Sequence, residues 1–143
     1  MYMWQYTMSN EFMRRSSEKG FEKFTEIGKH AWEILNVSKA LRDDIKVNIL
    51  THSDTVPGEF GASPIIKIKT IGKLLDDKIN PMGLFTILLF TDVHKKADGS
   101  MEYRFVTNND GTYPAKSPMG MFTDLYVPND LGAVLKAVDE YYN

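Results

Sequence analysis

The sequence contains no cysteine, only three histidines and no long apolar run. Without cysteine it has no disulfide, no thiolate nucleophile and no zinc–thiolate site. His30, His52 and His94 are too scattered to form a metal-ligand pair one helical turn apart, and we expect no metal site. No segment approaches the roughly 20 apolar residues of a membrane span, and polar residues between 5 and 11 rule out a signal peptide. We therefore expect a cytoplasmic protein that makes no membrane contact.

Length and charge narrow the class further. A chain of 143 residues with 43% hydrophobic content is long enough for one domain with a core and too short for two. The formal net charge of −2 and the pI of about 5.9 do not indicate attachment to DNA or membrane through bulk charge. We expect a single domain spanning residues 1–143.

Apolar periodicity predicts helices toward both ends of the chain. Over residues 21–41 the apolar positions recur at steps of three and four and form one stripe facing a core: Phe24, Ile27, Ala31, Ile34 and Leu35. Gly20 separates this helix from an earlier one predicted over 10–19. A final helix over 130–142 begins at a cap in Pro128-Asn129-Asp130 and carries four apolar residues inward: Leu131, Val134, Leu135 and Val138.

The middle of the chain predicts extended segments and a loop. Residues 46–51 form a short apolar run typical of a strand covered on both faces. The prolines and glycines of 55–64 predict a surface loop. An extended segment over 65–70 and a short helix over 71–78 follow.

A hairpin is the strongest extended prediction. Residues 84–93 and 101–107 are rich in β-branched and aromatic residues, and Asp98-Gly99 offers a turn between them. Together with the helices this gives an α/β chain. It has too few strands for a complete doubly wound domain, which usually has five or more.

Several segments carry a family resemblance. "KTIGKLLDDKI" and "AKSPMGMF" do not follow from generic α/β composition. With "NEFMRRSSEKGFEKFTEIGKHAWEILN", "VNILTHSD", "LFTILLFTDV" and "PNDLGAVLKAVDEYY", they resemble the C-terminal half of a phage-encoded family of RecA-like P-loop ATPases linked to DNA recombination or replication. The resemblance covers almost all of the chain. It implies a partial RecA-like P-loop NTPase core with a C-terminal antiparallel hairpin and a terminal helix, located in the host-cell cytoplasm.

The nucleotide-binding motifs of that family are absent. The chain has no G-x-x-x-x-G-K-[ST], so it lacks the amide loop and the lysine that hold a triphosphate. In the family a Walker B strand precedes the segment that resembles "WQYTMSNEFMRR", and here Met1, Tyr2 and Met3 stand in its place. We therefore expect a truncated family member that binds no cofactor alone, whereas Mg·ATP is the cofactor of the full-length family.

The resemblance supplies three candidate nucleotide-binding residues and no catalytic one. Thr51 and His52 match the strand end where RecA-like enzymes place a polar sensor near the γ-phosphate. The alternative is that they merely end a strand and hydrogen-bond a loop. Lys116 matches a region from which a subunit reaches its neighbour's nucleotide with a cation that stabilises the transferring phosphoryl group. The alternative for Lys116 is an ordinary solvated lysine.

Three lysines are candidates for binding single-stranded DNA. Lys67, Lys69 and Lys73 lie where such proteins commonly contact it, and alternation puts the first two on one strand face. A solvated strand face is the alternative. The aromatic residues Phe21, Phe24 and Trp32 are interpreted as core and not as a base-stacking platform, because they follow the apolar stripe of the helix.

Three functions follow from these patterns. The first is the C-terminal part of a RecA-like ATPase that is inactive alone. The second is a standalone, non-enzymatic phage protein, a regulator or counter-defence inhibitor acting through protein–protein interaction. The third, a nucleic-acid-binding module centred on 65–73, is weakened by the negative net charge. We also expect self-association or a protein partner, because apolar residues near Trp4, Met8 and Phe12 need cover.

Overall fold

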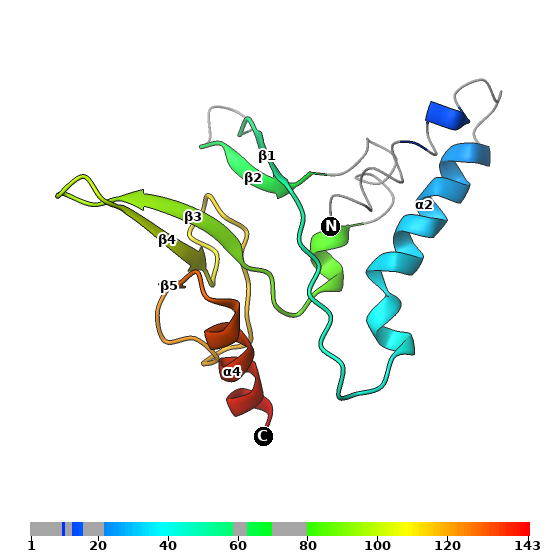
Figure 1. The fold of residues 1–143 in the computed structure, drawn as a ribbon. Helices are drawn as coiled ribbons and strands as arrows, with labels where there is room; N and C mark the ends of the chain where they lie inside the picture. The colour runs from blue at the N-terminus through cyan, green and yellow to red at the C-terminus, as the bar shows by residue number, and fades with distance from the viewer. Residues whose placement is uncertain (1–9, 11–12, 16–21, 59–62, 70–79) are drawn as a thin grey trace. The chain divides into compact units, whose positions relative to one another are not determined.

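A computed structural model of the 143-residue chain describes residues 10, 13–15, 22–58, 63–69 and 80–143. This described part is a mixed α/β fold with two helices and two antiparallel sheets (Figure 1). The element order is α2 (Glu22–Leu35), η1 (Val37–Ala40), β1 (Ser53–Val56), β2 (Ile65–Ile68), η3 (Pro81–Leu84), β3 (Phe90–Lys95), β4 (Met101–Val106), β5 (Tyr126–Pro128) and α4 (Leu131–Tyr142). Strands β1 and β2 form one sheet, and the other has the order β3-β4-β5.

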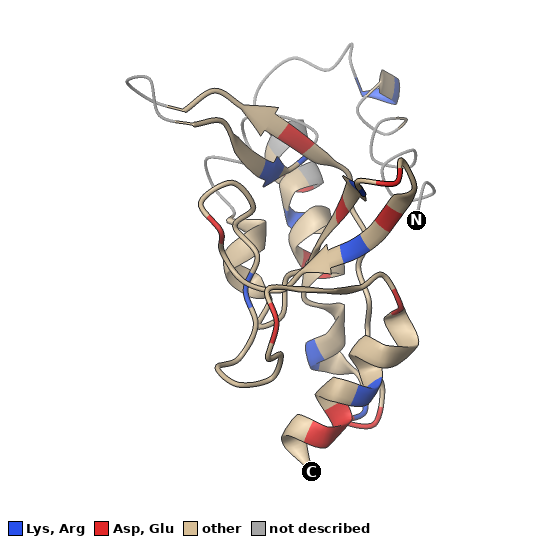
Figure 2. Cartoon of the chain, turned by 90° about the vertical axis from the view of Figure 1, so that its left-hand side faces the viewer, with Lys and Arg blue, Asp and Glu red and all other residues tan. Residues whose placement is uncertain are grey.

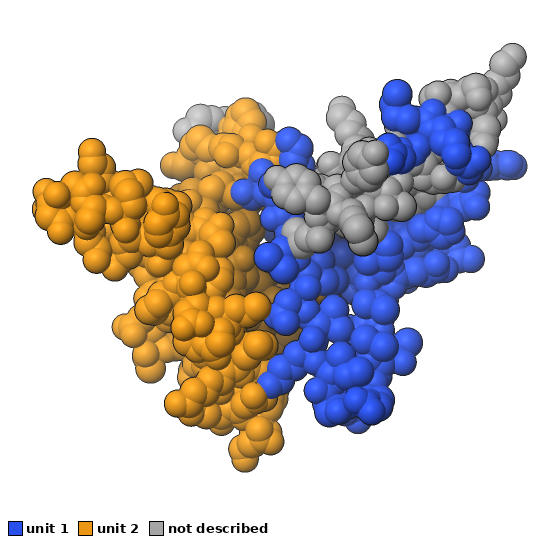
Figure 3. All heavy atoms as spheres, in the orientation of Figure 1, with its two compact units in different colours: residues 1–53, 68–84 blue, residues 54–67, 85–143 orange. Residues whose placement is uncertain are grey.

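The chain divides into two compact units (Figure 3). Unit 1 comprises residues 1–53 and 68–84, and unit 2 comprises residues 54–67 and 85–143. Unit 1 contains α2 and both short 3-10 helices, whereas unit 2 contains the three-stranded sheet and α4.

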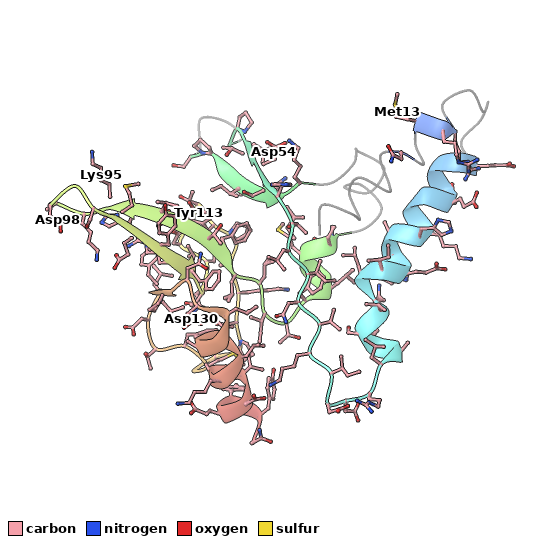
Figure 4. The ribbon with its side chains drawn as sticks, viewed as in Figure 1. Met13, Asp54, Lys95, Asp98, Tyr113 and Asp130 are labelled. Carbon is pink, nitrogen blue, oxygen red and sulfur yellow. The ribbon has the colours of Figure 1, made fainter. Side chains whose placement is uncertain are left out.

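The hairpin of β3 and β4 confirms the strongest strand prediction. The strands pair antiparallel from Phe90 opposite Val106 to Lys95 opposite Met101. At the tip, Gly99 adopts a φ of +84°, a conformation that a residue with a Cβ rarely adopts. The carboxylate of Asp98 accepts hydrogen bonds from the backbone N–H and the hydroxyl of Ser100, at 2.9 and 2.6 Å (Figure 4). The predicted first strand begins late, because the chain before β3 makes only an isolated bridge at Leu88.

The core of unit 2 lies on one face of this hairpin. Phe90 and Val106 are opposite each other and therefore share a face, and both are buried together with Ala115. Ile66, Leu88 and Tyr113 pack against this cluster. Two backbone contacts hold the loop after β4 in place, a bond from the Ile66 N–H to the Thr112 oxygen and the reciprocal pair between Leu88 and Lys116.

Helix α4 begins where its cap predicts. The Asp130 carboxylate accepts hydrogen bonds from the N–H groups of Gly132 and Ala133, at 2.8 and 3.3 Å. Val134 is buried, as predicted, but Leu131 is 45% exposed, so its inward assignment was wrong. The helix start and length are set locally, whereas the side that becomes buried depends on what packs there.

Helix α2 in unit 1 is shorter than its apolar pattern predicts. It ends at Leu35, where the N–H and the side-chain amide of Asn36 both bond to the Trp32 oxygen. Ala31 and Leu35 are buried, as predicted. Ile34 and Trp32 are 39% and 43% exposed, so their assignment to the core was wrong.

The strand predicted over 46–51 is absent. Residues 45–52 form no strand, and β1 begins at Ser53 inside a pair with β2. A strand exists only where another strand supplies its hydrogen bonds, and no described segment does so for 46–51.

Some predictions lie outside the described residues. These are most of the helix over 10–19, the helix over 71–78 and the apolar residues Trp4, Met8, Phe12 and Phe21.

Candidate functional site

In unit 1, His52 lies beside Lys69. His52 is one of the candidate nucleotide-binding residues, and Lys69 is one of the candidate DNA-binding lysines. The N–H of Lys69 donates to the His52 carbonyl oxygen at 2.8 Å. In an antiparallel pair this bond joins residues that lie opposite each other, so both side chains leave the same face. His52, Lys69 and the neighbouring Thr51 are exposed. The candidate nucleotide sensor and one candidate DNA-contacting lysine therefore lie together on an open surface of unit 1.

Lys116 lies in unit 2 on an ordered piece of backbone. Its N–H donates to the Leu88 oxygen at 2.9 Å, and its own oxygen accepts from the Leu88 N–H at 2.8 Å. The side chain is half-buried, and its ammonium forms no ion pair within the described part of the chain. Lys116 is thus a cation on a fixed backbone, which is compatible with both of its predicted roles.

Lys67 points away from the core of unit 2. It is exposed in β2, whereas Ile66 before it is half-buried against the core cluster. Counting along the antiparallel strands from the bond between His52 and Lys69 places Asp54 across from Lys67. Asp54 therefore reduces the positive potential around this lysine.

The third candidate lysine, Lys73, lies outside the described residues. Over the described elements, basic residues are interspersed with acidic ones (Figure 2). Such a surface favours specific contacts over attachment of nucleic acid through bulk charge.

A partly buried polar cluster of unit 2 was not predicted. The Arg104 Nε donates to the Asp92 Oδ2 at 2.7 Å, and these side chains are only 20% and 18% exposed. The guanidinium carbon lies 3.7 Å from the ring centroid of Tyr126, a cation–π contact. The hydroxyl of Tyr113 donates to the other oxygen of Asp92 at 3.2 Å (Figure 4). We call these four residues the Asp92–Arg104 network.

Asp110 extends the network into the loop after β4. Its carboxylate accepts bonds from the N–H groups of Tyr113 and Thr112, at 2.8 and 2.9 Å, and from the Tyr126 hydroxyl at 3.3 Å. Burial acts to raise the pKa of Asp110, but these hydrogen bonds together outweigh it and lower the pKa. The loop is therefore tied to β5 through an ionised carboxylate.

The two tyrosines of the network remain protonated near neutral pH. Burial and then the charge of Asp92 raise the pKa of Tyr113. Burial and then the charge of Asp110 raise the pKa of Tyr126. A phenol with a raised pKa donates hydrogen bonds and is a poor general base at neutral pH. The network therefore supplies fixed donors and acceptors that hold the sheet and loop together.

Part of this network had a sequence signal. Once the turn at Asp98-Gly99 fixes the hairpin register, Asp92 falls opposite Arg104, and opposite charges there stabilise a sheet. No comparable signal links Tyr113 or Tyr126 to the pair, because both lie on later segments whose paths the local sequence does not set.

The described ranges contain no group of three or more histidines or carboxylates arranged to hold a metal ion. Within the same ranges, no helix combines the length and apolar composition that a membrane crossing requires. Comparisons with protein-family models, with curated proteins and with solved structures found no match for the chain.

Proposed function

We propose that the chain corresponds to the C-terminal part of a phage RecA-like P-loop ATPase linked to DNA recombination or replication, and that it is not catalytically competent alone. The observation that carries this proposal is the resemblance along nearly the whole chain, above all in "KTIGKLLDDKI" and "AKSPMGMF". The chain carries no P-loop, so a triphosphate site needs residues from outside it.

The exposure of unit 1 supports this proposal. Between residues 32 and 50, seven of the nine large aliphatic or aromatic residues are exposed, namely Trp32, Ile34, Val37, Leu41, Ile45, Val47 and Leu50. Apolar surface on this scale marks a site that another polypeptide covers. A core that is completed only by a further polypeptide segment exposes apolar side chains in this way when that segment is missing.

In the proposed assembly the candidate residues act as the resemblance implies. Thr51 and His52 lie near the γ-phosphate, and Lys116 reaches a neighbour's nucleotide, where its charge stabilises the transferring phosphoryl group. Lys67, Lys69 and Lys73 contact the phosphates of single-stranded DNA. The Asp92–Arg104 network positions the loop that carries Lys116. The proposed location is the cytoplasm of the host cell.

Nucleotide binding tests the proposal in two steps. Calorimetry should show no binding of Mg·ATP to the isolated chain at micromolar concentration, and a phosphate-release assay should show no turnover above background. Phosphoryl transfer is catalysed almost wholly by positioning and charge, so losing the phosphate cradle and the metal site removes several orders of magnitude in rate. Turnover that disappears in Lys116→Ala would contradict the proposal.

The genomic sequence upstream of Met1 provides the second step. An in-frame P-loop there, joined to this chain, should give a protein that hydrolyses Mg·ATP and loses that activity in Lys116→Ala. A ribosome-binding site directly before Met1, with no P-loop upstream, would instead support a dedicated short protein. That second candidate function, a non-enzymatic phage regulator or counter-defence inhibitor, is favoured by the same exposed apolar residues of unit 1, because they fit a protein partner.

A further inference from the structure

The segment 45–50, "IKVNIL", has the composition of a strand but does not form one. It is rich in β-branched residues and contains neither proline nor glycine, which favours extended pairing. Ile45, Val47 and Leu50 are 41%, 37% and 62% exposed. The segment therefore displays apolar side chains that a paired and covered strand would bury.

Most of the backbone of this segment is also unpaired, although the Ile45 N–H donates to the Arg42 oxygen at 3.1 Å. Within the described part of the chain, residues 47–51 take part in no hydrogen bond, either through the backbone or through side chains. By contrast β3, which is also six residues long, pairs along its whole length with β4. An unpaired extended segment with an apolar face is a ready template for pairing with another strand.

We propose that residues 45–51 form an antiparallel strand pair with the same segment of a second copy of the chain. The two-fold axis of this pair passes between the two Asn48 residues. This inference goes beyond the proposed nucleotide chemistry and does not depend on it, because it concerns how the isolated chain, in which no further polypeptide covers unit 1, associates with itself.

The side-chain pattern favours a second copy as the occupant. Pairing about Asn48 sets Val47 opposite Ile49, and Ile45 opposite Thr51, on one face of the two-stranded pair. The other face sets Asn48 opposite itself, where two side-chain amides can exchange hydrogen bonds.

Charge is compatible with the same register. Lys46, the one charged residue in 45–50, falls opposite Leu50 and not opposite its own copy, so no like charges meet. The segment can thus pair with its own copy without placing like charges opposite each other, and the same residues serve both sides of the pair, as a two-fold interface requires.

Unit 1 has further exposed apolar surface. A lone pair of strands is marginal in water, so a stable dimer needs additional apolar area. Trp32, Val37 and Leu41 are exposed in the same unit, at 43%, 41% and 39%. The dimer therefore has apolar area available beyond the paired strands.

Single cysteines test this register directly, because the natural chain has none. Residues on the two-fold axis have Cα atoms about 4.5–5.5 Å apart, which is within the range of a disulfide. We expect Asn48→Cys to form a disulfide-linked dimer at least tenfold faster than Leu50→Cys under mild oxidation at equal protein concentration. Leu50 is the matched control, because its own copy lies four residues along the strand, roughly 13 Å away.

Sedimentation equilibrium provides the second measurement. The wild-type chain should show a reversible dimer. Asn48→Asp should weaken the dimer about tenfold, because two carboxylates then face each other, whereas Asn48→Thr should dimerise at least as well as wild type. Circular dichroism should show unchanged secondary structure in all variants.

Three results would overturn the inference. A chain that remains monomeric at all accessible concentrations has no such interface. Equal disulfide rates for Asn48→Cys and Leu50→Cys indicate random encounter or a parallel register. A dimer that Asn48→Asp does not weaken uses a different surface, and a segment that pairs only with a different protein would give a monomeric chain in the same assays.

Discussion

Replacing Arg104 with alanine should destabilise unit 2 far more than a typical surface substitution does. The change removes the 2.7 Å bond to Asp92 and the guanidinium that lies 3.7 Å from the Tyr126 ring centroid. It leaves the Asp92 carboxylate, 18% exposed, with the Tyr113 hydroxyl as its remaining hydrogen-bond donor. The loss therefore combines a mostly buried ion pair with a stacked cation.

The magnitude follows from how much of the pair is covered. Exposed ion pairs contribute about 0.2–1 kcal/mol, whereas removing one partner of a fully buried pair costs about 3–5 kcal/mol. Side chains that are 18% and 20% exposed fall between these limits, near 2 kcal/mol, and the cation–π contact adds about 0.5–1 kcal/mol. We expect Arg104→Ala to lower the free energy of unfolding by roughly 2–3 kcal/mol.

Urea unfolding followed by circular dichroism measures the loss, and hydrogen exchange at the β4 amides assigns it to unit 2. Arg42→Ala is the matched control, because Arg42 pairs with Asp44 at 3.1 Å while both side chains are more than two-thirds exposed. That control should change stability by less than about 0.5 kcal/mol. Equal effects of the two substitutions would refute the argument, because burial would then not distinguish the two pairs.

Three further substitutions test the cap, the loop and the core. Asp130→Ala should cost about 1 kcal/mol in urea unfolding, because it frees the N–H groups of Gly132 and Ala133 at the start of α4, whereas Asp130→Asn should retain most of the stability. Asp110 has a lowered pKa in the folded state, so its contribution is complete above its unfolded pKa and is lost as pH falls through the folded value. Acid titration of stability should therefore be shallower in Asp110→Asn than in wild type, and an identical slope would exclude this role. Phe90→Ala should cost about 3–5 kcal/mol because Phe90 is 7% exposed in the core, and Phe90→Leu should cost less than half as much.

The elements that were predicted correctly are those specified by nearby residues. The β3–β4 hairpin follows from two β-rich runs joined by Asp98-Gly99, and helix α4 follows from Asp130 and the apolar period after it. The short strand β5 was not predicted, because three residues carry too little pattern to indicate a strand.

The predictions that failed concern burial. Apolar periodicity locates a face on α2, but it does not say what covers that face, and Trp32 is 43% exposed. The strand predicted over 46–51 has the right composition and no described partner. A pattern that fits a buried strand is thus not sufficient for a strand.

For the candidate site, the sequence supplied the roles of the residues, and the structure supplied their positions. Sequence resemblance assigned Thr51, His52 and Lys116 to a nucleotide site and Lys67, Lys69 and Lys73 to DNA, and these assignments remain proposals. Only the fold shows that His52 lies beside Lys69 in unit 1. A backbone hydrogen bond joins these two residues, and no sequence pattern pairs them.

By itself, the sequence determined the hairpin, its turn and the capped C-terminal helix, because each forms within one continuous segment of at most 17 residues. It also determined the absence of a thiol and of a P-loop. The tertiary structure alone decided that Tyr113 and Tyr126 join Asp92 and Arg104, because those partners lie up to 34 residues apart, where the path of the chain sets proximity. It likewise decided that no described segment pairs with residues 47–51, since a strand forms only where a second strand satisfies its backbone groups.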